Sequence, residues 1–143
     1  MGLDMYLNAT RYLYDNDALA IAVRKLIGTP EGMDVKSVQL EAAYWRKSNQ
    51  IHSWFVTNVQ DGKDECQSSD VSREKLEELL SLVKRVLADR TLAETLLTPV
   101  GGFFFGSTDI DDWYWRDLEN TVEMLTRALA LPKGWYFEYR ASW

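Results

Sequence analysis

The chain has 143 residues, of which 46% are hydrophobic and 27% are charged, so it can build one domain with a real core and is too apolar to be disordered. Its formal net charge of −6 disfavours binding to a nucleic-acid backbone, which needs clustered lysine and arginine, and favours a partner with a basic surface. Aromatic residues reach 13%, a surplus that indicates either a thick core or an exposed contact face.

Cysteine and histidine each occur once, which limits the covalent and metal chemistry of the chain. Cys66 cannot form an intrachain disulfide, and one cysteine with one histidine cannot complete a typical structural zinc site. We therefore expect no metal and no cofactor. Nothing in the sequence resembles a signal peptide or reaches the length of a membrane span, so we expect a cytoplasmic protein with no membrane partner.

The two ends of the chain alternate between apolar and more polar residues. Residues 2–8 and residues 135–143 both have apolar side chains at every second position. A period of two predicts a strand with one buried face. We expect these terminal strands to be neighbours, with an Asp4–Arg140 pair on the open face, and a further short strand over residues 35–39.

Between these strands, apolar residues recur with helical spacing. Ser72 is a suitable N-cap and Gly28 a suitable C-cap. We predict a helix that begins after the N-cap candidates Asp15, Asn16 and Asp17 and ends at Gly28. Further helices are predicted over residues 40–59, from Ser72 through Leu87, over residues 90–97, and from Thr108 or Asp109 to Leu129. The apolar stripe of the first helix consists of Leu19, Val23, Leu26 and Ile27. The apolar run over residues 101–106 is predicted as a short strand or a buried loop.

These elements predict an α+β fold in a single compact domain over residues 1–143. We expect a small antiparallel or mixed sheet that includes the N- and C-terminal strands and packs against three to four helices.

The predicted helix over residues 40–59 carries more aromatic surface than one core-facing stripe can hide. On a helical wheel, Glu41, Trp45 and His52 fall within about 40° of one another beside that stripe, and Arg46 lies on the far side. Two interpretations remain open. The segment is either a large core helix with a satisfied histidine, or a recognition ridge in which Glu41 is the hydrogen-bond partner of the exposed rings.

His52 is also the natural candidate for a general base, because histidine titrates near neutral pH. Such a base needs an acid or a nucleophile nearby, and the candidates are Asp4, Glu41 and Cys66. Whether the chain is an enzyme stays open. A non-enzymatic role is favoured, since a lone cysteine is more commonly structural than reactive.

A second aromatic surplus lies at the start of the acidic helix. Trp113 and Trp115 flank a core tyrosine, and the three rings span about 200° of the helix, so at least one tryptophan must reach the surface. Asp111 and Asp112 precede them. The segment is either a solvated helix with one snorkelling aromatic ring, or an acidic, aromatic patch for a basic protein.

Several blocks of the sequence resemble a known family. The start MGLDMYL, the blocks YWRK and IHSWFV, and the segment GGFFFGST look like a family of small, functionally uncharacterised proteins of tailed bacteriophages and prophages. The resemblance implies a bacterial host cytoplasm and an accessory role, and it implies no catalytic residues. Small acidic phage proteins of this kind often inhibit host machinery, including defence systems, and that step rests on analogy.

Three hypotheses follow. The first is a phage accessory protein that binds a host or phage protein and does not bind nucleic acid directly, with these contact residues: Trp45, Arg46, His52, Trp113, Trp115, Asp111 and Asp112. The second is a small enzyme or small-ligand-binding protein with a pocket around His52, Glu41 and Asp4. The third is a homo-oligomer, such as a homodimer, that hides its aromatic rings against itself.

Overall fold

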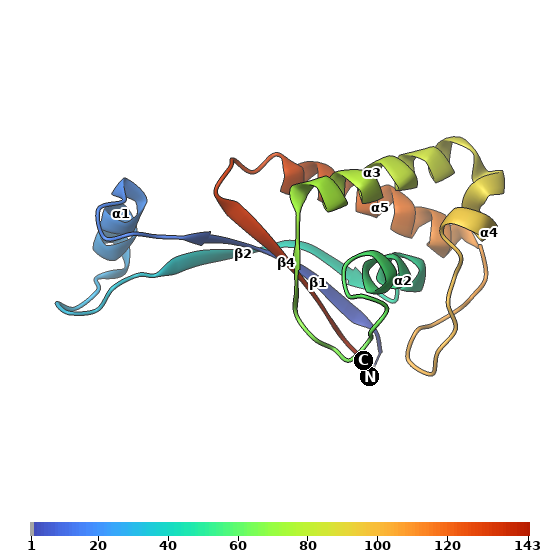
Figure 1. Cartoon of the computed structure of the whole chain (residues 1–143), viewed down its shortest axis with the longest axis horizontal. Coiled ribbons are helices and arrows are strands. Elements are labelled where there is room, and N and C mark those ends of the chain that lie inside the picture. Colours follow the sequence, from blue (N-terminus) through green and yellow to red (C-terminus); the bar gives the residue numbers. More distant parts are fainter. Residues whose placement is uncertain (1) are drawn as a thin grey trace.

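The computed structural model describes residues 2–143, and Met1 lies outside the described residues. The fold is α+β, as predicted, and its four described strands form one open antiparallel sheet (Figure 1). The elements in chain order are β1 (Asp4–Tyr12), α1 (Ala18–Ile27), β2 (Ser37–Arg46), α2 (Asn49–Asn58), β3 (Ser69–Val71), α3 (Arg73–Ala88), the 3-10 helix η1 (Arg90–Leu92), α4 (Ala93–Leu96), α5 (Asp112–Leu129) and β4 (Trp135–Ser142).

The two terminal strands, β1 and β4, are neighbours in a sheet whose order is β2-β1-β4-β3. This confirms the predicted pairing of the chain ends, and the N and C labels lie together in Figure 1. The predicted Asp4–Arg140 pair is wrong. The register places Arg140 opposite Tyr6, and Asp4 binds Arg46 on β2 instead.

The core lies between one face of the sheet and helices α2, α3 and α5. Met5 and Leu7 of β1 are fully buried on that face, whereas Asn8 between Leu7 and Ala9 points the other way and is partly exposed. Phe55 of α2 stacks on a tyrosine of β4, and α5 packs against both α3 and β2. These contacts fix the helices over the sheet and leave its opposite face uncovered by the core.

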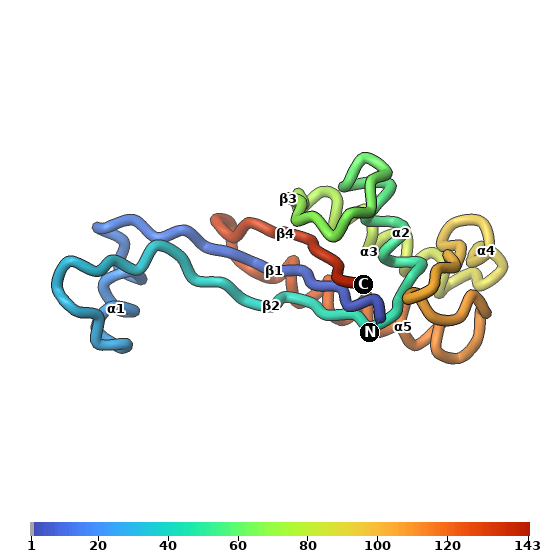
Figure 2. Tube along the Cα trace, turned by 90° about the horizontal axis from the view of Figure 1, so that it is seen from below, coloured from blue at the N-terminus to red at the C-terminus, as the bar shows by residue number. Residues whose placement is uncertain are grey.

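The β1–β2 hairpin extends away from this body as an arm and carries α1 at its tip (Figures 1 and 2). Asp17 caps α1 by accepting a hydrogen bond from the Leu19 N–H, and Gly28 ends it with a φ of 67°. Of the α1 residues only Ala20 is buried. The predicted α1 is therefore present, but Leu26 and Ile27 of its apolar stripe are exposed.

The predicted helix over residues 40–59 is wrong in its first half, where β2 runs to Arg46 and α2 begins only at Asn49. Ala43 and Trp45 are buried, and the residues between and after them are exposed, as in a strand. In the pairing with β1, Ala42 is an extra residue that has no partner, which makes it a bulge. The bulge interrupts the period of two, so the sequence of β2 does not alternate regularly.

The remaining helices begin and end close to their predicted limits. Ser72 caps α3, and the Asp111 carboxylate caps α5 by accepting two backbone N–H bonds at 3.0 Å each. The acidic helix thus starts at Asp112, a turn later than predicted. The segment over residues 101–106 is a loop whose Phe103 ring is exposed, so the predicted buried loop reaches solvent at its tip. Of the helices in residues 2–143, none is long and apolar enough to cross a membrane.

Candidate functional site

The single histidine lies inside the protein, with 1% of its surface exposed, and both ring nitrogens have partners. Nδ1 lies 2.7 Å from the Tyr139 hydroxyl, and Nε2 lies 2.9 Å from Oδ2 of Asp64. Oδ1 of Asp64 accepts a bond from the Trp143 indole at 3.0 Å. A neutral His52 protonated on Nε2 satisfies both contacts, since Nε2–H donates to Asp64 and Nδ1 accepts from Tyr139. The network joins α2, the loop after it and β4.

Burial raises the pKa of Tyr139 well above its ordinary value of 10, and the charge of Asp64 raises it further. The hydroxyl therefore keeps its proton and remains able to donate to His52. These hydrogen bonds hold α2, the loop after it and β4 together, and His52 has no contact with solvent. We interpret the network as structural.

The predicted pocket of His52 with Asp4 and Glu41 is not formed. Asp4 lies on the sheet face, where it accepts two bonds from Arg46 at 2.7 and 2.8 Å and one from the Tyr44 hydroxyl. The Tyr44 bond and the Arg46 bond and charge hold the pKa of Asp4 below its usual value. Glu41 lies in a groove beside α5. Because β2 pairs with β1 as a strand, Glu41 and His52 do not share the helix face on which the sequence analysis placed them.

Cys66 lies in the loop between α2 and β3, where it is partly exposed and has a φ of 56°. Its φ belongs to the left-handed region that non-glycine residues seldom adopt. Among the hydrogen bonds of residues 2–143, none joins its thiol to His52. Cys66, the remaining candidate for the pocket, is thus not a hydrogen-bond partner of His52 either.

Trp45, the leading predicted contact residue, is buried with 3% of its surface exposed. Its indole N–H donates to the Thr121 hydroxyl of α5 at 2.9 Å, and its ring meets the Phe55 ring edge-on at a centroid distance of 5.9 Å. The prediction that Trp45 offers a binding surface is therefore wrong. The ring belongs to the core and ties β2 to α5.

Three predicted contact residues do lie together, because Arg46, Asp111 and Trp113 line one cavity of about 250 Å³. Trp113 is 69% exposed, which confirms that one tryptophan of this segment reaches the surface. The Arg116 guanidinium lies 5.1 Å from the centre of its ring. Arg116 thus covers part of the exposed indole.

The other two predicted contact residues lie at the edges of this region. Trp115 is partly buried beneath the Arg90 guanidinium, which lies 4.4 Å from its ring centre. Asp112 is exposed in the first turn of α5. The N-terminal part of α5 is therefore acidic and aromatic at its surface, as the sequence indicates.

Asp117 lines the same cavity and is the carboxyl group with the largest upward shift. Burial raises the pKa of Asp117 to about 6, the nearby side chains of Ser48 and Gln50 lower it, and the charge of Asp111 raises it. Ser48 Oγ and Gln50 Nε2 are buried close to this carboxyl, yet within residues 2–143 neither makes a well-aligned hydrogen bond. The cavity wall therefore holds an acid that titrates near neutral pH.

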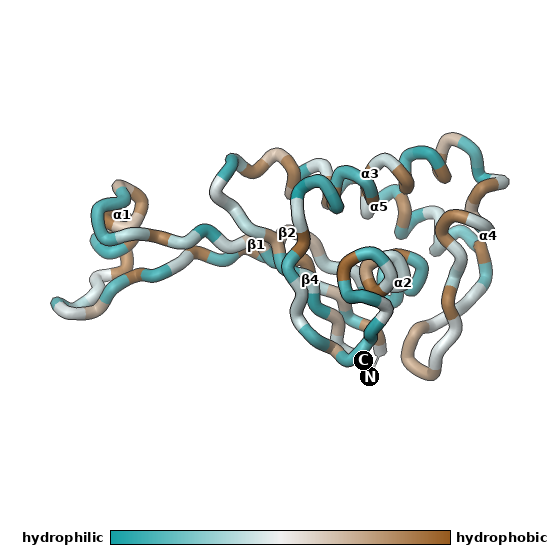
Figure 3. Tube along the Cα trace, viewed as in Figure 1, coloured by the Kyte–Doolittle hydropathy of each residue, from teal (hydrophilic) through white to brown (hydrophobic). Residues whose placement is uncertain are grey.

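The end of the arm carries several large exposed apolar side chains, two of which, Leu26 and Ile27, the sequence analysis placed in an apolar stripe. Leu26 is 84% exposed and Tyr14 is 77% exposed. Figure 3 shows apolar segments on and around α1, far from the body. We define the arm tip by five exposed residues: Tyr14, Ile21, Leu26, Ile27 and Met33.

The charges of the arm balance one another. Residues 11–40 contain four basic and four acidic residues, so the net charge of −6 belongs to the body. Arg24 binds Asp34 at 2.6 Å and Asp15 at 3.4 Å, and Lys36 binds Asp34 at 3.5 Å. The arm tip therefore presents apolar side chains beside ion pairs that are already formed.

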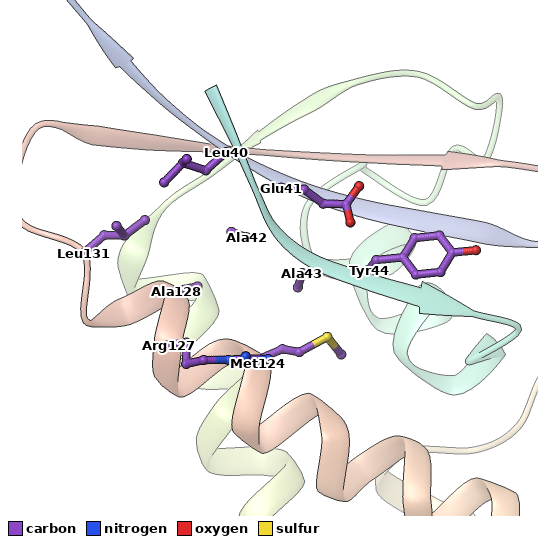
Figure 4. Close-up of a pocket in the computed structure, with 9 residues that line it drawn as sticks. All are labelled: Leu40, Glu41, Ala42, Ala43, Tyr44, Met124, Arg127, Ala128 and Leu131. Atoms are coloured by element: carbon purple, nitrogen blue, oxygen red, sulfur yellow. The ribbon is translucent and has the colours of Figure 1, made fainter. Parts of the chain in front are cut away.

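A groove of about 420 Å³ runs between β2 and α5 (Figure 4). The β2 wall is the segment from Leu40 to Tyr44, and α5 contributes Met124, Arg127 and Ala128. Glu41 and Arg127 both line this groove, and they form no ion pair with each other among the described residues.

Comparisons with known proteins add no relative, since no family model, curated protein or solved structure matched the chain. Within residues 2–143, no group of three or more histidine, cysteine, aspartate or glutamate side chains is arranged to hold a metal ion. The features that remain are the arm tip, the acidic end of α5 and the groove beside β2.

Proposed function

We propose that this protein acts by binding another protein and that the arm tip is its main contact. The supporting observation is the exposure of five large apolar side chains on a projection in which only Leu13 and Ala20 are buried apolar residues. A cluster of large apolar side chains that is exposed to water commonly marks a site of contact with a partner. The proposal moves the contact surface away from Trp45 and His52, which are buried.

Burial of the tip side chains would contribute free energy to binding. Covering one exposed leucine or isoleucine side chain contributes about 1.5–3 kcal/mol. Leu26, Ile27 and Ile21 together therefore contribute several kcal/mol, which offsets a substantial part of the entropic cost of association. An amphipathic helix of this kind fits an apolar groove on its partner.

The charge distribution supports a partner that is basic around such a groove. The arm is neutral and the body carries −6, so a basic surface beside the groove attracts the body while the tip inserts. The exposed acids Asp111 and Asp112 and the Trp113 ring would extend that contact. Following the phage resemblance, we propose an accessory protein of a bacteriophage that binds a host protein, with a host-defence protein as the class to test first.

The test compares capture by the wild-type protein with capture by a Leu26→Ser/Ile27→Ser variant. Both proteins are used as bait in lysates of infected bacteria, and any captured protein is purified and its affinity measured directly. We expect the double substitution to weaken the purified interaction at least about tenfold, because two anchoring side chains are lost. Phe103→Ser is the control, since this ring is 95% exposed but lies on the body.

Equal affinity of the double variant and the wild type for the purified partner would refute the role of the arm tip. Loss of binding in the Phe103→Ser variant alone would move the contact to the body. If the wild type binds only itself through the tip, as shown by light scattering of both arm variants, the protein is a homo-oligomer and the proposal fails.

A further inference from the structure

We propose that the cavity at the start of α5 binds an organic cation that carries N–H donors, such as an alkylguanidinium group. The inference goes beyond the proposed function, because it concerns the body of the protein and does not depend on the arm tip. It rests on buried donors that lack a well-aligned acceptor, on an acidic and aromatic wall, and on basic side chains whose charges are directed elsewhere.

The first observation is a pair of buried hydrogen-bond donors beside Asp117. Ser48 is fully buried and Gln50 is 3% exposed. Within residues 2–143, Ser48 Oγ and Gln50 Nε2 make no well-aligned hydrogen bond, yet both lie near enough to the Asp117 carboxyl to lower its pKa. Buried polar groups without partners are costly and rare. Asp117 and Gln50 both line a cavity of about 250 Å³, so the unsatisfied groups gather at its wall.

A positive charge in the cavity completes this arrangement. Burial raises the pKa of Asp117 to about 6, so the carboxyl is partly protonated near that pH and is then a poorer acceptor. A neighbouring cation favours the ionised carboxylate. The ionised group has enough acceptor positions for Ser48, Gln50 and an N–H donor of the ligand together. A cationic ligand thus binds Asp117 directly and gives both buried donors an acceptor.

The second observation is that the cavity wall is acidic and aromatic. Asp109 and Asp111 line the same cavity and are exposed. The Trp113 indole adds electron-rich ring surface to the wall, and the Arg116 guanidinium already lies 5.1 Å from the centre of that ring. Carboxylates beside ring surface suit an organic cation, whereas a hard metal ion prefers a shell of oxygen ligands.

The third observation is that the two basic residues of the wall direct their charges away from it. Arg46 binds the Asp4 carboxylate at 2.7 and 2.8 Å. The Lys47 stem passes Gly106, where an added Cβ would lie 3.3 Å from its Cδ. Its Nζ would lie 3.5 Å from a Cβ at Gly2, which does not line the cavity. The carboxylates of the wall therefore stay available to a ligand.

The test uses n-propylguanidinium chloride as the probe and the full chain as the protein. Binding is followed at pH 7.5 by nuclear magnetic resonance, through the signals of the Trp113 indole and the Gln50 side-chain amide. We expect both signals to shift, with a Kd of about 1 mM or tighter. Tetramethylammonium chloride is the matched probe, because it is a cation without N–H donors. It should bind at least about tenfold more weakly.

Asp117→Asn is the decisive variant, because it removes the charge and keeps the size of the side chain. We expect it to weaken probe binding at least about tenfold. Glu119→Gln is the matched control on the same helix, since this exposed carboxyl lies outside the cavity, and its affinity should stay within about twofold of the wild type. Circular dichroism verifies that both variants are folded.

The pH dependence gives a second readout that a merely structural Asp117 would not produce. About a tenth of this carboxyl is ionised at pH 5 and nearly all of it at pH 7.5, so the wild type should bind the probe about tenfold more weakly at pH 5. Asp117→Asn should lose this dependence while it keeps the other titratable and charged groups of the wall, which are Arg46, Lys47, Asp109, Asp111 and Tyr114.

A further comparison identifies the source of the cation. N-acetyl-Gly-Arg-Gly-amide carries the same guanidinium group on a peptide. Binding of this peptide at least as tight as that of n-propylguanidinium assigns the site to an arginine side chain of a protein partner. Binding of n-propylguanidinium alone assigns it to a free small molecule. Either result supports a site for an organic cation.

Four results would overturn the inference. They are the absence of signal shifts up to about 50 mM probe, equal affinity of Asp117→Asn and the wild type, equal affinity for tetramethylammonium, and the same shifts with magnesium chloride at lower concentration. The Leu26→Ser/Ile27→Ser variant should bind the probe as the wild type does. Failure of the arm tip and failure of this cavity are therefore separate outcomes.

Discussion

The Nδ1 atom of His52 lies 2.7 Å from the hydroxyl oxygen of Tyr139, although the two residues are 87 positions apart in the chain. Both side chains are at most 1% exposed, so neither can exchange its partner for water. The bond joins α2 to the last strand and belongs to a network that continues through Asp64 to the Trp143 indole. Its contribution is to the stability of the fold.

Tyr139→Phe is expected to destabilise the protein by about 1–3 kcal/mol, because it leaves Nδ1 of His52 buried without a hydrogen-bond partner. Chemical denaturation measures this free energy. Tyr136→Phe is the matched control on the same strand, and we expect a change within about 0.5 kcal/mol since Tyr136 is exposed. Equal losses for the two variants would contradict a special role for the His52 bond.

Trp45→Phe is expected to cost about 1–3 kcal/mol through the lost bond to Thr121 and the smaller ring. Binding to a purified partner should be unchanged once the variant is folded, because the indole does not reach the surface. Trp113→Phe provides the contrast, since it should leave stability nearly unaltered. A folded Trp45→Phe protein that fails to bind would restore Trp45 as a contact residue.

Asp117→Asn is expected to change the pH dependence of stability. The folded-state pKa is about 6 and the reference value is 3.8, so the folded protein holds an extra proton between these values. The stabilisation this provides is present below pH 3.8 and is lost as pH rises through 6. The variant stays neutral, so at pH 7.5 it should be more stable than the wild type by about 1 kcal/mol, a figure reduced for partial solvent screening.

The measurement is urea denaturation of both proteins at pH 4 and pH 7.5. The difference between the variant and the wild type should be larger at pH 7.5 than at pH 4. A difference that is the same at both pH values would show that the carboxyl group does not titrate in this range.

Leu26→Ser/Ile27→Ser is expected to leave the free energy of unfolding within about 1 kcal/mol of the wild type, because these side chains are already exposed in the folded protein. Leu125→Ser on α5 is the control. It places a hydroxyl at a fully buried position and should cost about 3 kcal/mol or more. Thermal unfolding distinguishes the two cases. A large loss in the arm variant would mean that the tip is covered within a folded assembly.

Local sequence patterns predicted much of the fold. The alternation at both chain ends predicted β1 and β4, and the cap residues Ser72 and Gly28 predicted helix limits well. These signals succeed because a period of two, a capping side chain and a left-handed glycine act within a few residues of chain. The acidic, aromatic start of α5 was predicted for the same reason.

The candidate site was predicted less well, because its geometry depends on pairing between distant segments. Residues 40–46 contain glutamate and alanine, which favour a helix, and the bulge at Ala42 interrupts their alternation. Alignment with β1 overrode that preference. It separated Glu41 from His52, buried Trp45 and created the groove beside α5.

The sequence by itself determined the fold class, the two terminal strands, the capped helices and the acidic net charge, since each depends on composition or short-range pattern. Tertiary structure alone decided which apolar residues face water. The stripe of α1 satisfies every local rule for a core helix, yet the arm holds it away from the body. Burial depends on what lies opposite a helix face in space, and a local pattern contains no information about that.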